Sequence, residues 1–565
     1  MSQNTKTKDQ KPKTKNRFTW LLFALVIVFI YFYGLNIPLL GPDEPRYSQV
    51  AREMFERGDW ITPTLGGFDW FEKPALLYWL QIASYKIFGV SEFAARFGSA
   101  LFGMGTIFSL WILGKRIQDS GLETQGFSGI QNPKSKIQNP TVDFANWLAL
   151  IAASSIGIIA FSRGASFDII LTFPLTAALV SFFIFDSAYI NHDANESDEK
   201  SNVLPFIIYR SPFTIKYLPL FTFYFFIGAA LLAKGLIGIV FPFAIVAFYY
   251  VLSWRLPNKT FIISLFWGTI LSLIVASLWY LPMYQANGWK FVDEFFIQHH
   301  FQRYTSNKYQ HPQPFWFFWL VLPLMTIPWL PFFLASIWNF VKVQGSKFKV
   351  QNLKTEVQDS KYEIQTHKNY GKLSTLHSPL SSFALAWLLV PLVFFSVSGS
   401  KLPGYILPAL PAALIFTAEY VCRYVQKSRK REIFVKLTAF ATFAVVAVLL
   451  QFFVMTYAKH ETVKNLIETA NANGCANERI VNLYTVSHNL EFYAAGRLVR
   501  DADGKLKRYE DFSVLVKELK SGNNKRILVL VPQKDVANLT TDETIEAKIL
   551  GDNGESALVL LEKKF

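Results

Sequence analysis

Long apolar segments restrict the fold of this chain more than any other feature of its sequence. Eleven of them approach the ~20 residues that a helix needs to cross ~30 Å of hydrocarbon. They lie at residues 18–33, 92–114, 144–162, 167–188, 215–232, 235–252, 261–283, 314–340, 380–398, 402–424 and 434–457. A twelfth apolar segment, 74–90, is shorter and contains Lys86, so it is expected to lie along the membrane interface or to form a short extra span. The predicted fold is an all-α polytopic membrane protein with about 11–13 transmembrane helices.

Composition and charge agree with a membrane protein and exclude other classes. Only 17% of the 565 residues are charged, whereas a soluble domain usually carries about a quarter. The net charge of +15 does not indicate nucleic-acid binding, because the Lys and Arg residues lie in short segments between apolar runs, where they set membrane orientation. The two cysteines, Cys422 and Cys475, offer neither a disulfide framework nor a metal cluster.

The basic residues also predict the orientation. The Lys-rich tail 1–17 is expected in the cytoplasm, and the first apolar segment has no small-residue cleavage site after it, so it is interpreted as a retained helix. Alternating the spans then places every strongly basic connection in the cytoplasm, as the positive-inside rule requires. Two low-complexity insertions, 117–142 and 341–379, fall on this side and are expected to be flexible loops. The odd number of helices places the C-terminus outside.

A different composition begins after the last apolar segment. Residues 18–457 are expected to form the transmembrane domain, and residues 458–565 resemble a soluble domain in composition. Strand-like segments at 480–486, 527–531 and 557–561 alternate with helical patterns at 462–470 and 512–519. This alternation predicts a small α/β domain on the outer face.

The first outward loop, 36–91, carries an acidic motif. Its residues 41–47 read Gly-Pro-Asp-Glu-Pro-Arg-Tyr, and a helical pattern follows. Asp43 is therefore expected near a helix start at the membrane surface, where a carboxylate can orient or deprotonate an acceptor or hold a cation. The alternative is a helix cap with surface salt bridges.

Glu72 and Lys73 enter an aromatic segment later in the same loop. A lysine at that depth is suited to hold a lipid phosphate as a point charge. Ordinary snorkelling of the lysine towards the interface is the alternative interpretation.

Further ionisable residues recur at the outer ends of other spans. The tight turn 163–168 has Arg163 and Asp168 at its ends, which predicts either a structural Arg–Asp pair or a second acid for the same site. Lys234 and Lys401 lie at outer span boundaries, as anchors or as phosphate ligands. The segment 284–313 adds Arg303, a candidate phosphate clamp, and the histidines His299, His300 and His311. Because all these residues share one predicted side, they are expected to form one site.

These motifs resemble those of a known family. They are similar to the bacterial aminoarabinose transferase branch of the dolichyl-phosphate-mannose protein mannosyltransferase superfamily, which has the GT-C fold. The resembling segments are GPDEPRYSQVAREM (41–54), WFEKPALLYW (70–79), RGASFD (163–168), LLAKGLIGIVFP (231–242), HFQRY (300–304) and SKLPGYILPALPA (400–412). The cytoplasmic insertions depart from the family pattern, and the resemblance after residue 458 is loose.

The resemblance implies a function and a set of site residues. The protein would be an inverting glycosyltransferase in the bacterial inner membrane, acting as a monomer at the periplasmic face. Its donor would be a polyprenyl-phosphate monosaccharide, and its acceptor a lipid, glycan or protein. Asp43 and Asp168 would be catalytic. A divalent metal, Zn or Mg, would be held by Glu72 and His300. The residues expected to contact substrate are Glu44, Arg46, Tyr47, Glu72, Lys73, Tyr78, Arg163, Lys234, Arg303 and Lys401.

Two other classes of protein are compatible with many spans. A lipid-linked-sugar transporter or flippase should show internal repeats and charged or broken helices near the membrane midplane. The sequence shows no such repeat, and its charges gather at one face. A non-catalytic assembly protein would not need paired acids. The transferase interpretation is therefore favoured.

Overall fold

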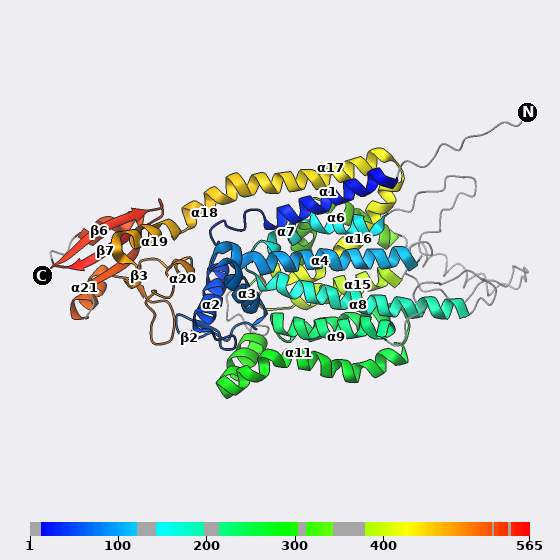
Figure 1. Cartoon of the computed structure of the whole chain (residues 1–565), viewed down its shortest axis with the longest axis horizontal. Helices are drawn as coiled ribbons and strands as arrows, with labels where there is room; N and C mark the ends of the chain where they lie inside the picture. Colours follow the sequence, from blue (N-terminus) through cyan, green and yellow to red (C-terminus); the bar gives the residue numbers. More distant parts are fainter. Residues whose placement is uncertain are drawn as a thin grey trace, which may run out of the picture.

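The computed structural model describes residues 13–120, 143–196, 214–302, 312–342, 379–522, 525–540 and 544–564. They form a bundle of long helices and a smaller domain at the C-terminus, which lies beyond one end of the bundle (Figure 1). A layer made of α2 and α3 lies between the two parts. The greater parts of the two predicted insertions, residues 121–142 and 343–378, lie outside the described residues.

Apolar helices occur at all eleven predicted positions. Seven described helices are long and apolar enough to cross a membrane, or up to nine if each of two bent helix pairs counts as one span, and two shorter apolar helices add to them. This confirms an all-helical polytopic membrane domain. Its helices are α1 (Lys13–Phe32), α4 (Glu92–Ser120), α6 (Phe144–Ala153), α7 (Ile156–Ser162), α8 (Phe167–Glu196), α9 (Thr214–Lys234), α10 (Ile237–Leu252), α11 (Lys259–Val292), α13 (Phe317–Met325), α15 (Pro379–Ser396), η3 (Pro403–Ala409), α16 (Leu410–Gln426) and α17 (Arg429–Val448).

The two bent helix pairs are hydrogen-bonded to each other at their breaks. The helices α6 and α7 meet at 59°, and α13 meets the helix Leu330–Lys342 at 118°. A break frees backbone groups that lipid cannot satisfy. Here the Ile156 amide donates to the Ile327 carbonyl at 2.8 Å, and the Trp329 indole donates to the Ser154 hydroxyl at 3.0 Å. The two breaks therefore satisfy polar groups across the contact between them.

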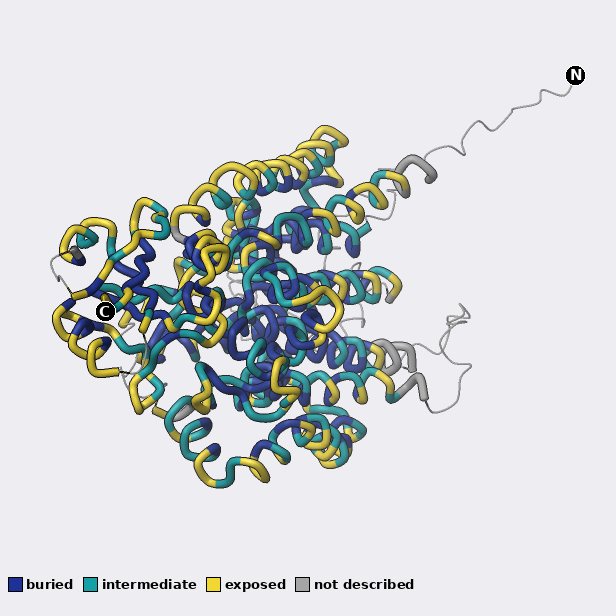
Figure 2. Tube along the Cα trace, turned by 60° about the vertical axis from the view of Figure 1, so that its left-hand side comes forward, coloured by how far each residue is buried: buried dark blue, intermediate teal, exposed yellow. Residues whose placement is uncertain are grey.

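Burial divides the bundle into central and peripheral helices. The most apolar windows of the spans containing α16 and α8 are 89% and 78% buried, whereas those containing α11 and α17 are only 28% buried. In Figure 2 the dark buried trace accordingly gathers in the middle of the bundle and the exposed trace lies at its edge. Apolar side chains on α11 and α17, such as Phe266 and Phe440, are exposed on the bundle surface. In a membrane this surface would contact lipid, which suits apolar side chains.

The layer between the bundle and the C-terminal domain consists of short elements. It comprises α2 (Asp43–Arg57), the hairpin strands β1 (Thr64–Leu65) and β2 (Phe68–Asp69), and α3 (Leu76–Phe88). The helix α2 ends at Gly58, whose φ of 68° is left-handed and favours glycine. The 13 residues of α3 span only about 20 Å, so this segment is too short to cross the membrane alone. That length favours the interfacial interpretation of the twelfth apolar segment.

The C-terminal domain is built on a mixed five-stranded sheet with strand order β4-β3-β5-β7-β6. Strands β3, β4 and β5 run parallel, and β7 pairs antiparallel with both β5 and β6. The three predicted strands correspond to β3, β5 and β7, which confirms an α/β domain. Its elements are α18 (Met455–Glu461), α19 (Lys464–Ala470), β3 (Ile480–Leu483), α20 (Leu490–Tyr493), β4 (Arg508–Tyr509), α21 (Phe512–Ser521), β5 (Arg526–Pro532), β6 (Ile545–Asp552) and β7 (Ser556–Lys563).

Candidate active site

The acidic motif forms the start of α2, as its sequence predicts. Gly41 has a φ of 64°, which turns the chain into Pro42, and Asp43 is the first residue of the helix. A carboxylate in the first turn interacts favourably with the helix dipole. The Asp43 side chain is 55% exposed and lies 3.5 Å from the Arg46 guanidinium, one turn further on. Asp43 is therefore an accessible carboxylate with one loose ion-pair contact.

Glu44, the next residue, is built quite differently. Its two carboxylate oxygens accept from Arg96 Nε at 2.9 Å and Nη2 at 2.7 Å. The backbone amides of Leu40 and Ala165 donate to the same carboxylate at 2.9 and 2.8 Å. Arg96 also donates to the carbonyls of Leu35, Ile37 and Pro38. This buried clasp joins the loop before α2 to α4 and to the turn before α8.

The electrostatics of Glu44 agree with a structural role. Burial alone would raise the pKa of its carboxyl group. The Arg96 charge and the bonds from Arg96, Leu40 and Ala165 outweigh burial and hold that pKa below its ordinary value. Glu44 was expected among the substrate-binding residues, but its partners favour a role in fixing the position of Asp43.

Arg46 connects three parts of the site. Its guanidinium faces the Asp43 carboxylate, lies 5.6 Å from the centre of the Trp70 ring, and reaches His488 Nδ1 at 3.5 Å. His488 belongs to the C-terminal domain, so α2 meets that domain directly beside the acidic motif. The position of α2 between bundle and domain is visible in Figure 1.

Glu72 and Lys73 lie close together on the same layer. Lys73 Nζ is 3.2 Å from Glu72 Oε1, and both side chains are largely buried. The Tyr78 ring of α3 is fully buried. The pKa of the Tyr78 hydroxyl is raised well above its ordinary value, mainly by burial and then by the negative charge of Glu72. The positive charge of Arg46 opposes this rise. The Glu72 and Arg46 charges therefore act on the same hydroxyl.

Phe167 joins the three motifs. The Tyr47 ring of α2 contacts it edge-on at 4.9 Å between centroids, and the Tyr78 ring of α3 does so at 5.4 Å. Phe167 is the first residue of α8, directly before Asp168. The predicted convergence of these separate motifs is thus seen in the packing of α2, α3 and α8.

Asp168 forms an ion pair with Lys234 at the end of α9. The Ser166 hydroxyl lies 3.3 Å from the other carboxylate oxygen, and Lys234 Nζ lies 4.9 Å from the centre of the Tyr405 ring. A side chain at Gly404 would overlap the Asp168 carboxylate, so the SKLPGY segment approaches this ion pair closely. Two motifs far apart in sequence therefore meet at Asp168.

Two other predicted residues have structural partners. Arg163 donates to the backbone carbonyls of Ile30 and Tyr33. Of the two alternatives for this turn, the structural Arg163–Asp168 pair is therefore wrong. Lys401 is buried and donates to the Ser398 carbonyl at 2.6 Å. Both cations thus hold backbone segments next to helix ends.

The metal site expected from Glu72 and His300 lies partly outside the described part of the chain. No group of three or more His, Cys, Asp and Glu side chains there is close enough to hold a metal ion. The side chain of His300, together with Arg303 and His311, lies outside the described residues. Of the two expected ligands, the described one, Glu72, has the Lys73 ammonium beside its carboxylate.

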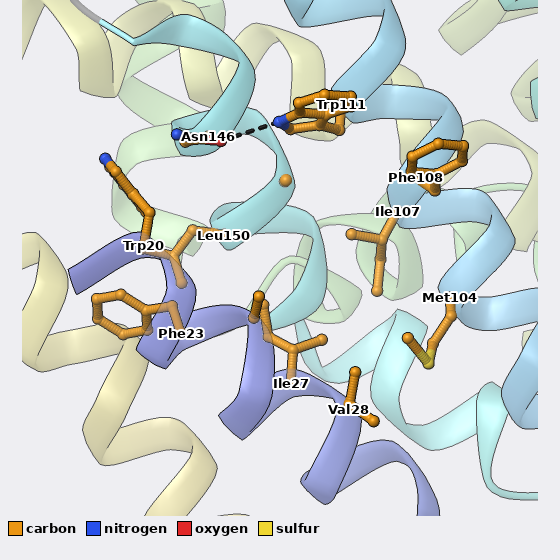
Figure 3. A pocket seen from close by; sticks show the side chains of 12 residues that line it. Trp20, Phe23, Ile27, Val28, Met104, Ile107, Phe108, Trp111, Asn146 and Leu150 are labelled. Carbon is orange, nitrogen blue, oxygen red and sulfur yellow. Dashed lines mark hydrogen bonds between the residues drawn. The ribbon is translucent and has the colours of Figure 1, made fainter. Parts of the chain in front are cut away.

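An apolar crevice of about 240 Å³ lies elsewhere in the bundle, between α1, α4 and α6 (Figure 3). It is lined by Trp20, Phe23, Ala24, Ile27, Val28, Met104, Ile107, Phe108, Trp111, Asn146, Ala149 and Leu150. On α4 it extends from Met104 to Trp111, which is about 12 to 22 Å along the helix from Arg96. The crevice is thus separate from the candidate active site.

Several residues of the site were not anticipated from the sequence. Arg96, Trp70, Tyr405 and His488 all contact predicted site residues. Arg96 has a recognisable signal, because a charge within an apolar segment is costly and is usually paired or functional. Trp70 and Tyr405 lie within two of the motif segments but were not selected there as site residues. His488 has no such signal, since it is 442 positions from Arg46.

Comparisons with known proteins agree with this architecture. Residues 9–121 match the family model of the dolichyl-phosphate-mannose-protein mannosyltransferases. The undecaprenyl phosphate-alpha-4-amino-4-deoxy-L-arabinose arabinosyl transferase of Aeromonas salmonicida is 27% identical over 71% of this chain and 60% of its own length. The protein of the same name from Shewanella sediminis is 27% identical over 72% of this chain and 61% of its length. The chain thus matches about three fifths of the length of these relatives.

Solved structures define the fold. ArnT from Cupriavidus metallidurans, in its crystal structure bound to undecaprenyl phosphate, superposes with a TM-score of 0.66 at 19% identity, over 96% of this chain and 97% of that one. The archaeal oligosaccharyltransferase AglB from Archaeoglobus fulgidus gives a TM-score of 0.51 at 12% identity, over 92% and 69% of the two chains. This protein is therefore a polytopic membrane protein of the GT-C fold class. Its sequence is similar to aminoarabinose transferases and, over residues 9–121, to the dolichyl-phosphate-mannose-protein mannosyltransferases.

Proposed function

We propose that this protein is an integral membrane glycosyltransferase. It transfers a monosaccharide from a polyprenyl-phosphate-linked donor to a lipid, glycan or protein acceptor. The reaction takes place at the periplasmic face of the bacterial inner membrane, where α2, α3 and the C-terminal domain lie. The likeness to ArnT, whose structure contains undecaprenyl phosphate, and the aminoarabinose transferase relatives support this class of donor.

The observation that carries the proposal is the contrast between Asp43 and Glu44. Glu44 receives four hydrogen bonds and fixes the start of α2. Asp43 is thereby held at the same helix start with its carboxylate more than half exposed. A rigidly placed, accessible acid is what a general base requires. If Asp43 had only a structural role, its carboxylate would be expected to be hydrogen-bonded like that of Glu44 rather than exposed.

The residues around Asp43 suit glycosyl transfer. In the reaction the bond between the anomeric carbon and the donor phosphate oxygen breaks, and the electron pair leaves with the phosphate. Lys73 is placed to stabilise the charge that develops there. The acceptor oxygen attacks from the opposite face, which inverts the anomeric centre. When the acceptor is a hydroxyl, Asp43 takes its proton; when it is a phosphate, no base is needed and Asp43 orients the acceptor.

Asp168 is the second acid in this proposal. Its ion pair with Lys234 lies next to Phe167, on which Tyr47 and Tyr78 pack. This places a second charged group beside the acidic motif, from a different helix. We assign Asp168 and Lys234 to substrate orientation rather than to proton transfer, because the carboxylate is engaged by a cation.

A transporter of lipid-linked sugars is the competing function, and detergent micelles separate the two. The purified protein is incubated in micelles with labelled polyprenyl-phosphate monosaccharides and a total lipid and protein extract. A transferase releases sugar-free polyprenyl phosphate in equal amount to the labelled acceptor. A transporter has no second compartment in micelles and leaves the donor intact. An intact donor across a panel of sugars, together with donor translocation in proteoliposomes, would overturn the proposed transfer.

A further inference from the structure

The C-terminal domain is docked onto the membrane domain by polar contacts of long sequence separation. The Tyr493 hydroxyl accepts from the Leu39 amide at 3.0 Å and donates to Glu92 at 3.1 Å. Lys464 Nζ reaches the same Glu92 oxygen at 2.8 Å. Arg52 of α2 donates to the Phe492 carbonyl at 3.4 Å. Phe492 and Tyr493, at the end of the segment 484–493, are thereby held against α2 and the start of α4.

His488 lies in this docked segment, and its Nδ1 is 3.5 Å from Arg46 Nη2. A guanidinium can only donate, so the imidazole must be neutral at Nδ1 to accept this bond. The same guanidinium stays 3.5 Å from the Asp43 carboxylate, whereas a tight Arg–carboxylate pair closes to about 2.8 Å. His488 and Asp43 therefore both face the Arg46 guanidinium, through different nitrogens.

We propose that His488 is a positioning residue through which the C-terminal domain controls sugar transfer. Its neutral imidazole holds Arg46 in place, so that Arg46 does not close on Asp43 and neutralise it. Transfer then requires the domain to be docked and the imidazole to be unprotonated. This inference rests on the proposed function and adds a residue, and a domain, to its active site.

The surroundings of His488 define how it responds to pH. Burial first, and then the Arg46 charge, lower the pKa of the imidazole below its ordinary value, while the Asp43 charge opposes them. Glu491, on the same segment, is engaged by Arg500. Glu53, on α2, accepts from Thr64 and Gly66. On acidification through the His488 pKa, the protonated ring can no longer accept from Arg46 and repels it.

The test compares two substitutions of His488 in the full-length protein. His488→Gln keeps a hydrogen-bond acceptor that does not titrate, and His488→Leu removes the acceptor. We expect kcat to fall about tenfold or more in His488→Leu at every pH, with little change in the KM for the donor. We expect His488→Gln to keep the wild-type kcat near neutral pH. Its fall in kcat at acid pH should be displaced from that of the wild type, because the part that depends on the imidazole is lost and only the part expected of a carboxylate general base remains. A merely structural histidine would not give this separation.

His460→Gln is the matched control, because His460 lies in the same part of the chain on exposed α18. His460→Gln should keep the wild-type kcat near neutral pH and the wild-type fall in kcat at acid pH. An unchanged kcat in His488→Leu overturns the inference. So does an acid fall in kcat that lies at the same pH in His488→Gln as in the wild type. If His488→Leu does not fold, the pH profile of His488→Gln alone decides it. A wild type without transfer activity at any pH overturns the proposed function as well, whereas an active wild type isolates the role of His488.

Discussion

Two clusters of ionisable residues lie at opposite ends of the bundle, and they are built on different principles. At the end away from the C-terminal domain, called the inner end here, Asp186 of α8 is only 3% exposed. Both of its oxygens are satisfied, by the hydroxyls of Tyr249 and Tyr250 at 2.8 and 3.0 Å and by Arg255. At the outer end, Asp43 is 55% exposed and has a loose contact with Arg46. A charge at a membrane boundary is therefore not in itself a sign of function; the sign is a charge that is held in place but left accessible.

The largest expected effect on stability comes from breaking the inner cluster. In Asp186→Asn the Arg255 charge loses its carboxylate in a largely buried setting. Breaking a buried pair in this way costs about 3–5 kcal/mol. We expect a marked loss of thermal stability in detergent, with unchanged transfer per folded molecule. Asp503→Asn, at an exposed position of the C-terminal domain, is the charge-matched control, and equal stability of the two variants would contradict the assignment.

A smaller effect is expected at the outer cluster when one phosphate ligand is removed. Lys73→Met keeps much of the apolar stem but removes the charge proposed to meet the donor phosphate. Loss of a charged hydrogen bond of about 1.5–3 kcal/mol should weaken donor binding roughly 10- to 100-fold. Donor affinity can be measured by titration calorimetry in detergent. Lys86→Met, on the exposed side of the same layer, should bind donor normally; unchanged affinity in Lys73→Met would remove Lys73 from the phosphate site.

A pH-dependent effect on stability is expected at Glu44. Its pKa is lowered in the folded protein, so its contribution to stability is present above the ordinary carboxyl pKa and is lost as the pH falls through the lower, folded-state pKa. When melting temperatures are measured from neutral to acid pH, Glu44→Gln should show a smaller fall in melting temperature than the wild type. Glu510→Gln, at an exposed position, should retain the wild-type fall. If the melting temperature of Glu44→Gln fell with pH as that of the wild type does, the Glu44 charge would not stabilise the fold.

The sequence predicted the apolar helices because length and hydropathy are local properties. It could not predict the breaks between α6 and α7 and after α13, since these depend on a bond between Ile156 and Ile327. In the C-terminal domain, β3, β5 and β7 were predicted from continuous apolar runs that are buried. The edge strand β6 was missed because most of its residues are exposed or half-buried and it lacks an apolar run.

The candidate site shows the same division between local and long-range information. Asp43 at a helix start follows from the local pattern of prolines and acids. The partners that distinguish Glu44 from Asp43, and Asp168 from Arg163, lie 52 and 66 positions away on other helices. A pattern in one sequence cannot show which of the many distant residues is the partner of a given charge. The sequence therefore identified most of the charged residues but could not assign their individual roles.

The most direct test of this account compares Asp43→Asn with Asp186→Asn in one transfer assay. Both proteins are purified in detergent, the folded fraction is quantified, and sugar transfer from polyprenyl-phosphate donors is measured per folded molecule. We predict that Asp43→Asn transfers about 100- to 10,000-fold more slowly with an unchanged melting temperature, while Asp186→Asn melts earlier but transfers at the wild-type rate. Wild-type transfer by Asp43→Asn would contradict the central claim that the accessible acid at the start of α2 does the chemistry.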